Sequence, residues 1–323
     1  MGIRNLNRFL NDNSPNSIKL CKLAELSGKT IAVDISIYLY KFSSDDTLIE
    51  NIYLMLAVFK HYAITPIFIF DGKAPPEKYE LLQKRKEDKK EAEEKYRNLQ
   101  QTLALNKDMN NADKQELIYN MDMLKKNFIS ISKRDIETVK QIILAYGATY
   151  YDAIGEADEL CALLTIKNKV WACLSEDMDM FVYGCPRVIR YISLLKHTAV
   201  LYDVKDILNN LGITQKELRE ICILSGTDYN LDCVDNNALT NTLKHFKKYH
   251  KTKSGLGFYE WLNINRVGVI KDFGLLNKIN EIFDLTINNY NSKMFDKMKT
   301  GNGRINTDDL AIILKTVGFL YMA

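Results

Sequence analysis

Acidic residues that could bind a metal ion stand at widely separated points of the sequence. Each lies where the local pattern predicts the end of a strand or the start of a helix, and the seven are Asp34, Asp71, Glu156, Asp158, Asp177, Asp179 and Asp228. Like charges within a few ångströms repel and raise one another's pKa unless a cation lies between them. Mg²⁺ prefers oxygen ligands, and two such ions about 3.5–4 Å apart suit in-line phosphodiester cleavage. If these segments meet, the sequence predicts a two-metal hydrolytic site.

The alternation of strands and helices predicts that the segments do meet. Short apolar runs indicate buried strands at 30–34, 66–71, 149–153, 170–175, 188–192 and 200–204. Helical patterns fall at 48–63, 132–146, 157–168 and 215–225. This order is typical of an α/β fold, a mostly parallel twisted sheet flanked by helices. Because ligands of such sheets bind beyond the carboxyl ends of the strands, we expect the acids at one edge.

A single Asp at a strand end is more often a turn former or a helix cap than a metal ligand. The paired acids argue against that explanation here. Glu156 with Asp158, and Asp177 with Asp179, place two carboxylates two residues apart at predicted helix entrances, where the helix dipole favours negative charge. A cap needs one acid rather than two, so the pairs favour a metal site.

Length and composition indicate the size of the domain and argue against a membrane protein, a secreted protein and a structural zinc site. The 323 residues are 46% apolar with a formal net charge of +3, which is enough for one large domain with a satellite. No run of about 18 apolar residues predicts a membrane span, and the N-terminus lacks the apolar core of a signal peptide. Six scattered cysteines without a Cys-x-x-Cys pair favour free thiols over structural zinc. An intracellular protein is expected.

Residues 73–130 differ from the rest in their dense mixed charge. They predict a long exposed helix, a loop near 106–112 and a second helix over 113–128. An insertion of this length between strands is usually a lid or a binding element. Residues from about 215 to 323 read as mainly helical.

Five segments, in order and at similar spacing, resemble motifs of the flap endonucleases within the XPG/RAD2-type structure-specific 5′ nucleases. They are AVDISIYLYKF, IFDGKAPPEKYELLQKR, GEADELCA, SEDMDMF and CILSGTDY. The resemblance covers residues 1 to about 230 and implies a PIN/5′-nuclease-like fold. It implies a catalytic core over 1–230 with N- and I-type regions, including a helical gateway or arch at 73–130. Residues 231–323 would be a helical DNA-binding region with a degenerate helix–two-turn–helix motif.

The resemblance also implies roles for individual residues. The seven acids match positions that hold two Mg²⁺ ions, for which Mn²⁺ can substitute. Lys78 and Arg85 match cations that hold the scissile phosphate, and their alternative is an ordinary solvated helix face. Tyr40 matches an aromatic that stacks on a base, and its alternative is core packing. Further contacts with DNA are expected from Gly2, Lys133 and Arg134.

The sequence departs from the family after Asp228. No glycine stands between Tyr229 and Lys253, and Asp232 and Asp235 lie where an acid would repel phosphate. The duplex anchor is therefore altered and its K⁺ site is in doubt, with replacement phosphate contacts expected from Lys244, Lys247 and Lys248. The C-terminus does not support a sliding-clamp partner, and we expect a monomer. A trimmed, Lys- and Asn-rich chain suggests a large DNA virus or a protist, with the protein in the nucleus or a cytoplasmic viral factory.

The prediction is therefore a Mg²⁺-dependent structure-specific 5′ endonuclease or exonuclease. It would hydrolyse DNA at single-strand/double-strand junctions in replication, repair or recombination. One alternative keeps the fold and changes the substrate, as in a Holliday-junction or RNA-directed nuclease. Another is a non-catalytic DNA-binding scaffold, against which the full acid set argues.

Overall fold

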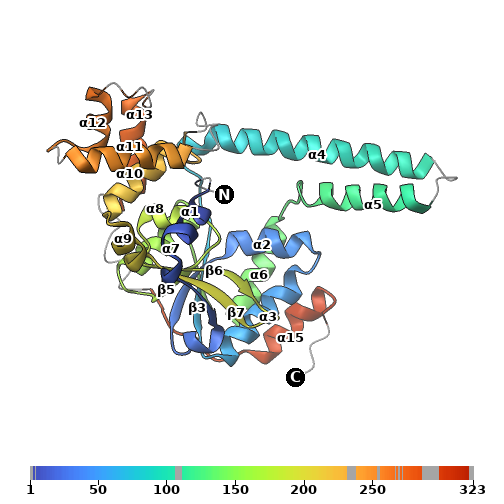
Figure 1. Cartoon of the computed structure of the whole chain (residues 1–323). Coiled ribbons are helices and arrows are strands. Elements are labelled where there is room, and N and C mark those ends of the chain that lie inside the picture. Colours follow the sequence, from blue (N-terminus) through green and yellow to red (C-terminus); the bar gives the residue numbers. More distant parts are fainter. Residues whose placement is uncertain are drawn as a thin grey trace.

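A seven-stranded sheet wrapped by helices carries a two-helix arm and a cluster of C-terminal helices (Figure 1). The computed structural model describes residues 3, 5–105, 111–230, 238–252, 255–265, 267, 270, 272–285 and 298–319. Within helix α5, the side chains of residues 111–113, 116, 119 and 122 also lie outside this description.

The sheet is mixed but mainly parallel, as the sequence predicts. Its strands run in the order β1-β7-β6-β5-β2-β3-β4, and the pairs β6–β5, β5–β2, β2–β3 and β3–β4 are parallel. The strands are β1 (Ile18–Lys22), β2 (Thr30–Asp34), β3 (Thr65–Phe70), β4 (Thr149–Asp152), β5 (Ala172–Leu174), β6 (Arg187–Ser193) and β7 (Thr198–Asp203). The six predicted strands are confirmed within two residues at each end. Strand β1 was missed, because it lies at the sheet edge and four of its five residues are partly or fully exposed.

Alternate side chains of the central strands enter two different cores. Ala32 packs with one face of the sheet, and its neighbours Ile31 and Val33 pack with the other. The first face is covered by α1 (Leu6–Asn13), α7 (Ala157–Ile166), α8 (Asp179–Tyr183), α9 (Val204–Leu211) and α10 (Gln215–Ser225). The second is covered by α2 (Ile35–Ser44), α3 (Leu48–His61), α6 (Lys133–Ala145) and α15 (Thr307–Thr316). Covering both faces buries the apolar strands and leaves the strand ends for chemistry.

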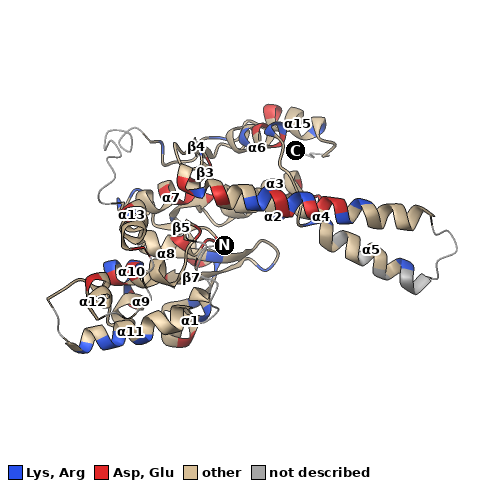
Figure 2. Ribbon diagram, turned by 90° about the horizontal axis from the view of Figure 1, so that it is seen from above, with Lys and Arg blue, Asp and Glu red and all other residues tan. Residues whose placement is uncertain are grey.

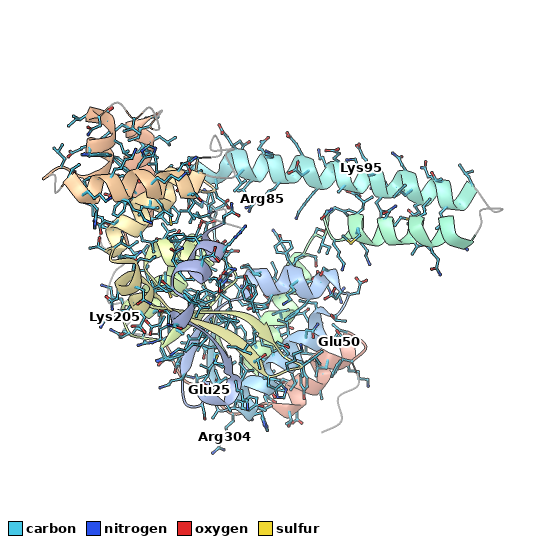
Figure 3. All side chains as sticks on the ribbon, viewed as in Figure 1. Glu25, Glu50, Arg85, Lys95, Lys205 and Arg304 are labelled. Atoms are coloured by element: carbon cyan, nitrogen blue, oxygen red, sulfur yellow. The ribbon has the colours of Figure 1, made fainter. Side chains whose placement is uncertain are left out.

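The predicted 73–130 insertion forms an arm that projects from the sheet (Figures 1 and 3). The chain first makes a 3₁₀ turn, Pro76–Lys78, and then helix α4 (Tyr79–Leu105). Helix α5 (Asn111–Lys125) packs along α4, and the ring of Tyr96 on α4 meets that of Phe128, which follows α5, at 5.3 Å. The predicted long helix thus begins later than residue 73, and most of the predicted loop lies outside the described residues.

The C-terminal helices divide between two parts of the molecule. Helices α11 (Ala238–Thr252), α12 (Phe258–Ile264) and α13 (Phe273–Phe283) gather beside α10. Helix α15 instead returns to the sheet and packs on α6, where Leu310 and Leu314 are fully buried. Its approach is fixed by a bond from the Asn306 N–H to the Ala145 carbonyl at 2.7 Å.

Two expectations from composition can be compared with the described residues. No described helix combines the length and apolar character needed to cross a membrane. The five described cysteines are free and buried (Cys21, Cys161, Cys173, Cys185 and Cys222).

Candidate active site

Four neighbouring parallel strands deliver acids to one edge of the sheet. Asp34 is the last residue of β2 and Asp71 follows β3, whereas the acidic pairs follow β4 and β5. These strands are adjacent in the order β5-β2-β3-β4. The chain runs from β2 to β3 on one side and later returns to β5 on the other, so the strand order reverses here. Ligands bind at such a reversal beyond the carboxyl ends of the strands.

The acids share one cavity of about 610 Å³ with the base of the arm. Asp228 arrives there from the segment after α10, which the sheet topology alone does not predict. Six of the seven predicted acids line the cavity (Asp34, Asp71, Glu156, Asp158, Asp177 and Asp228). The seventh, Asp179, lies buried beneath them.

Three carboxylates are close enough to bind a single cation. Asp158, Asp177 and Asp179 each offer an oxygen, and these oxygens all lie within 4.8 Å of one another. The Oδ1 atom of Asp179 is buried and accepts no hydrogen bond from any described residue. A buried charged oxygen without a partner is costly, so this donor set fits a hard divalent metal ion.

A hydrogen-bonded chain positions the acids on β2 and after β5. The Ser175 hydroxyl donates to Asp34 Oδ2 at 2.8 Å and accepts from the Asp177 backbone N–H at 3.1 Å. Asp177 Oδ1 in turn accepts from the Asp179 N–H at 3.0 Å. The serine thereby fixes the spacing between acids on two strands.

Asp71 combines a capping role with its place in the cavity. Its Oδ1 accepts the Ala157 N–H at 2.8 Å, at the start of α7. The expected capping contact is therefore present, and the same carboxylate also lines the acid cavity. The contact also holds the end of β3 against the helix that carries Asp158.

Glycine is required where β3 and β4 end side by side. The Gly72 N–H donates to the Gly155 carbonyl at 2.8 Å. A Cβ atom on Gly72 would collide with the backbone carbonyl oxygen of Ala153. This close approach brings Asp71 and Glu156 to the same cavity.

Burial and mutual repulsion favour protonation of several carboxyls in the metal-free protein. Burial and the neighbouring charge of Asp71 raise the pKa of Asp34 to about 7. Burial raises the pKa of Asp158 well above its ordinary value, although Lys78 opposes this shift. Burial and Asp177 likewise raise the pKa of Asp179. Raised pKa values of this kind are typical of functional sites, where carboxyl groups are held close together at a cost to the stability of the fold.

Two cations from the base of the arm neutralise part of this charge. Lys78 Nζ lies 2.6 Å from Glu156 Oε2, and Arg85 Nη2 lies 2.9 Å from Asp228 Oδ2. Burial alone would lower the pKa of Lys78, but Asp158, Tyr229 and Glu156 raise it above its usual range. Lys78 ends the 3₁₀ turn and Arg85 lies in α4, and both line the cavity. Figure 3 shows Arg85 at the base of the arm, with Lys95 farther out.

An aromatic side chain and a third cation line the same cavity. The Tyr40 side chain is 49% exposed rather than packed in the core, and it contributes to the cavity wall. Lys89 Nζ lies 5.0 Å from the centre of its ring and donates to the Ile129 carbonyl at 3.1 Å. Lys89 thus joins α4 to α2 and to the segment after α5.

The remaining predicted DNA contacts lie outside the acid cavity. Lys133 and Arg134 are exposed at the start of α6. Lys244 and Lys247 line a separate groove with Arg8 between α1 and α11, of about 540 Å³. Lys248 is exposed on α11, along which lysines recur (Figure 2). Gly2, Asp232 and Asp235 lie outside the described residues, as does the rest of 231–237, where the doubtful K⁺ site would fall.

Sequence reasoning missed three residues that hold this site together. Ser175 bridges two acids, and Lys89 contacts Tyr40. The Tyr229 hydroxyl donates to Glu156 Oε2 at 3.2 Å, and its ring lies 4.8 Å from Lys78 Nζ. Two of these residues stood inside the quoted motifs, SEDMDMF and CILSGTDY. The four-residue spacing from Arg85 to Lys89 was a further available signal.

Two family models match the chain across the regions that build this site. Residues 1–92 match the XPG N-terminal domain and residues 147–228 match the XPG I-region. Flap endonuclease 1 of Zea mays is 28% identical over 292 residues, which cover 84% of this chain and 73% of that protein. Flap endonuclease 1 of Brugia malayi is 30% identical over 250 residues, 71% of this chain and 62% of that protein.

Solved structures share the fold. The catalytic core of Rad2 in complex with DNA substrate aligns with a TM-score of 0.64 at 21% identity, covering 96% of this chain and 93% of that chain. Flap endonuclease-1 from Methanococcus jannaschii aligns with a TM-score of 0.58 at 23% identity, covering 93% and 90%. The chain belongs to the XPG/Rad2-type family of structure-specific nucleases. It is a nuclease hydrolase whose buried acidic cluster is compatible with divalent metal binding.

Proposed function

We propose that this nuclease hydrolyses a DNA phosphodiester at a 5′ single-strand/double-strand junction, with two Mg²⁺ ions held by the acid cluster. The observation that carries the proposal is one cavity that six acids from five segments line together with Lys78, Arg85 and Tyr40. When bound, divalent cations supply Lewis-acid activation of the phosphate and of the attacking water. Asp158, Asp177 and Asp179 would hold one ion. Asp34, Asp71, Glu156 and Asp228 would complete the site.

The arm supplies the charges that act on the phosphate. Lys78 and Arg85 each have a cationic end within 3 Å of a carboxylate of the site. Side-chain cations in a partly enclosed cavity stabilise the negative charge that develops on a phosphate during cleavage. To contact a substrate phosphate, Lys78 must move away from Glu156 or bind both groups at once, and the same holds for Arg85 and Asp228. Divalent metal and the arm cations therefore serve as alternative counter-charges for the same acids.

Tyr40 and the α1–α11 groove suit the two sides of a junction. An exposed aromatic at the cavity wall can stack on an unpaired base without sequence preference. Arg8, Lys244 and Lys247 line the groove on α1 and α11, where they can neutralise duplex phosphates without reading sequence. Lys133, Arg134 and Lys248 remain further proposed phosphate contacts. The division into a core of 1–230 and a DNA-binding region of 231–323 is likewise proposed, with α15 packed on the core.

A substrate panel tests this function. The wild-type protein and Asp177→Asn would be compared on a 5′-flap, a four-way junction and an RNA-flapped duplex. We expect wild type to cut the DNA flap fastest and Asp177→Asn to bind it without cutting. If the four-way junction or the RNA-flapped duplex is cut faster than the DNA flap, that substrate would replace the DNA flap as the proposed one. Tight DNA binding by wild type with no cleavage of any substrate would support a scaffold instead.

A further inference from the structure

The active-site lysine is backed by an aromatic stack that extends into the C-terminal helices. Tyr229 lies with its ring 4.8 Å from Lys78 Nζ, and its hydroxyl donates to Glu156, the carboxylate that also pairs with Lys78. A ring face and a carboxylate on two sides restrict where the ammonium group can lie. Tyr229 therefore helps to fix the position of Lys78, both through its ring and through Glu156.

Phe283 holds Tyr229 from behind. It is the last residue of α13 and is fully buried. Its ring meets Tyr229 edge-on, with centroids 5.4 Å apart and planes at 88°, and meets Tyr183 at 4.8 Å. Edge-to-face pairs at these distances are favourable and directional, so Phe283 restricts the tilt of the Tyr229 ring.

The end of α13 is itself fixed to the rest of the molecule. Arg219 on α10 donates to Asn280 Oδ1 at 2.6 Å, to the Phe283 carbonyl at 3.5 Å and to Asp284 Oδ2 at 2.6 Å. These bonds bracket Phe283 on both sides along the chain. A continuous set of contacts thus runs from α10 and α13 to the active-site lysine.

We propose that Phe283 is a positioning residue for Lys78, acting through Tyr229. Phe283 is not among the residues that line the acid cavity, and it lies beyond the regions that match the family models. The inference rests on the proposed function only in that Lys78 acts on the phosphate. Its consequence is that the C-terminal helices help to set the rate of cleavage as well as to bind duplex.

Chemical labelling tests the positioning without any cleavage. The intact protein would be acetylated briefly, and Lys78 labelling measured by mass spectrometry against the exposed Lys86. Phe283→Leu is expected to raise the Lys78/Lys86 labelling ratio at least about threefold. Phe258→Leu is the matched control, because Phe258 is equally buried in α12 but packs on Phe246 instead. An unchanged ratio in Phe283→Leu would overturn the proposal.

A double-mutant cycle separates positioning from a general structural role. In the protein that keeps Lys78, Phe283→Leu is expected to slow single-turnover flap cleavage about tenfold. In the Lys78→Ala background, the same substitution is expected to slow cleavage less than about twofold. An equal loss in both backgrounds would overturn the proposal. Phe283→Met, whose flexible side chain can fill an irregular gap in a core, replaces Phe283→Leu if thermal unfolding shows that the leucine variant does not fold. If wild type cuts no substrate, the proposed function fails and the labelling result still decides this inference.

Discussion

Arg85 Nη2 lies 2.9 Å from Asp228 Oδ2, which joins the base of the arm to the acid that arrives after α10. The two residues are 143 positions apart in sequence. Lys78 and Glu156 make a similar junction at 2.6 Å. The base of the arm thus contacts the acid cluster and supplies part of its counter-charge.

Arg85→Ala separates the catalytic contribution of this cation from metal binding. We expect single-turnover cleavage to fall by about 10²-fold or more, because a charge that stabilises the transition state is lost. Mg²⁺ affinity measured by calorimetry should stay the same or rise, since a cation competing for Asp228 is gone. The control is Arg97→Ala, an exposed residue of α4 paired with Glu93, which should stay within about twofold of wild type. A fall in Mg²⁺ affinity would contradict this account.

Asp179→Asn should stabilise the metal-free protein while it abolishes metal binding. Asp179 is buried among other carboxylates, and its Oδ1 lacks a partner among the described residues. Removing its charge relieves repulsion, so Tm in EDTA should equal or exceed that of wild type. The increase in Tm on adding Mg²⁺ should disappear. Glu91→Gln, at an exposed position on the arm, should keep the full increase. A marked loss of Tm in EDTA would show that Asp179 is structural.

The stabilising effect of Mg²⁺ should depend on pH. The folded protein keeps a proton on Asp34 up to about pH 7, whereas the unfolded chain releases it near pH 4. As pH rises through this window, the metal-free fold therefore loses stability relative to the unfolded chain. A cation bound only by the fold reverses the loss. Thermal unfolding should show a larger Mg²⁺-induced gain in Tm at about pH 8 than at about pH 5. Equal gains would contradict the raised pKa.

The α1–α11 groove should contribute to duplex affinity through charge alone. The double variant Lys244→Ala/Lys247→Ala should bind duplex DNA more weakly, whatever its sequence. The slope of log affinity against log salt should fall by about one to two, one unit per lost phosphate contact. Lys315→Ala on α15, on a different part of the molecule, should leave both quantities unchanged. An unaltered slope in the double variant would remove the groove from the DNA interface.

Much of the sheet and most of the acid cluster were predictable because local patterns encode them. Apolar runs such as 66–70 are buried, and carboxylates that follow parallel strands must share an edge. Strand β1 was not predictable in this way, because an exposed edge strand lacks that pattern. The support of Lys78 by Phe283 through Tyr229 was also hidden, since contacts between distant segments depend on tertiary packing. Asp228 was singled out with the other acids, but the strand pattern could not place it at the sheet edge, because it follows helix α10.

Cleavage of a 5′-flap duplex against a blunt duplex of the same sequence, each with Mg²⁺ and with EDTA, tests the central claim most directly. The account predicts cutting confined to the flap junction, present with Mg²⁺ and absent with EDTA. Equal digestion of both duplexes would contradict selection of the junction. Cutting that persists in EDTA would contradict the role given to the acid cluster.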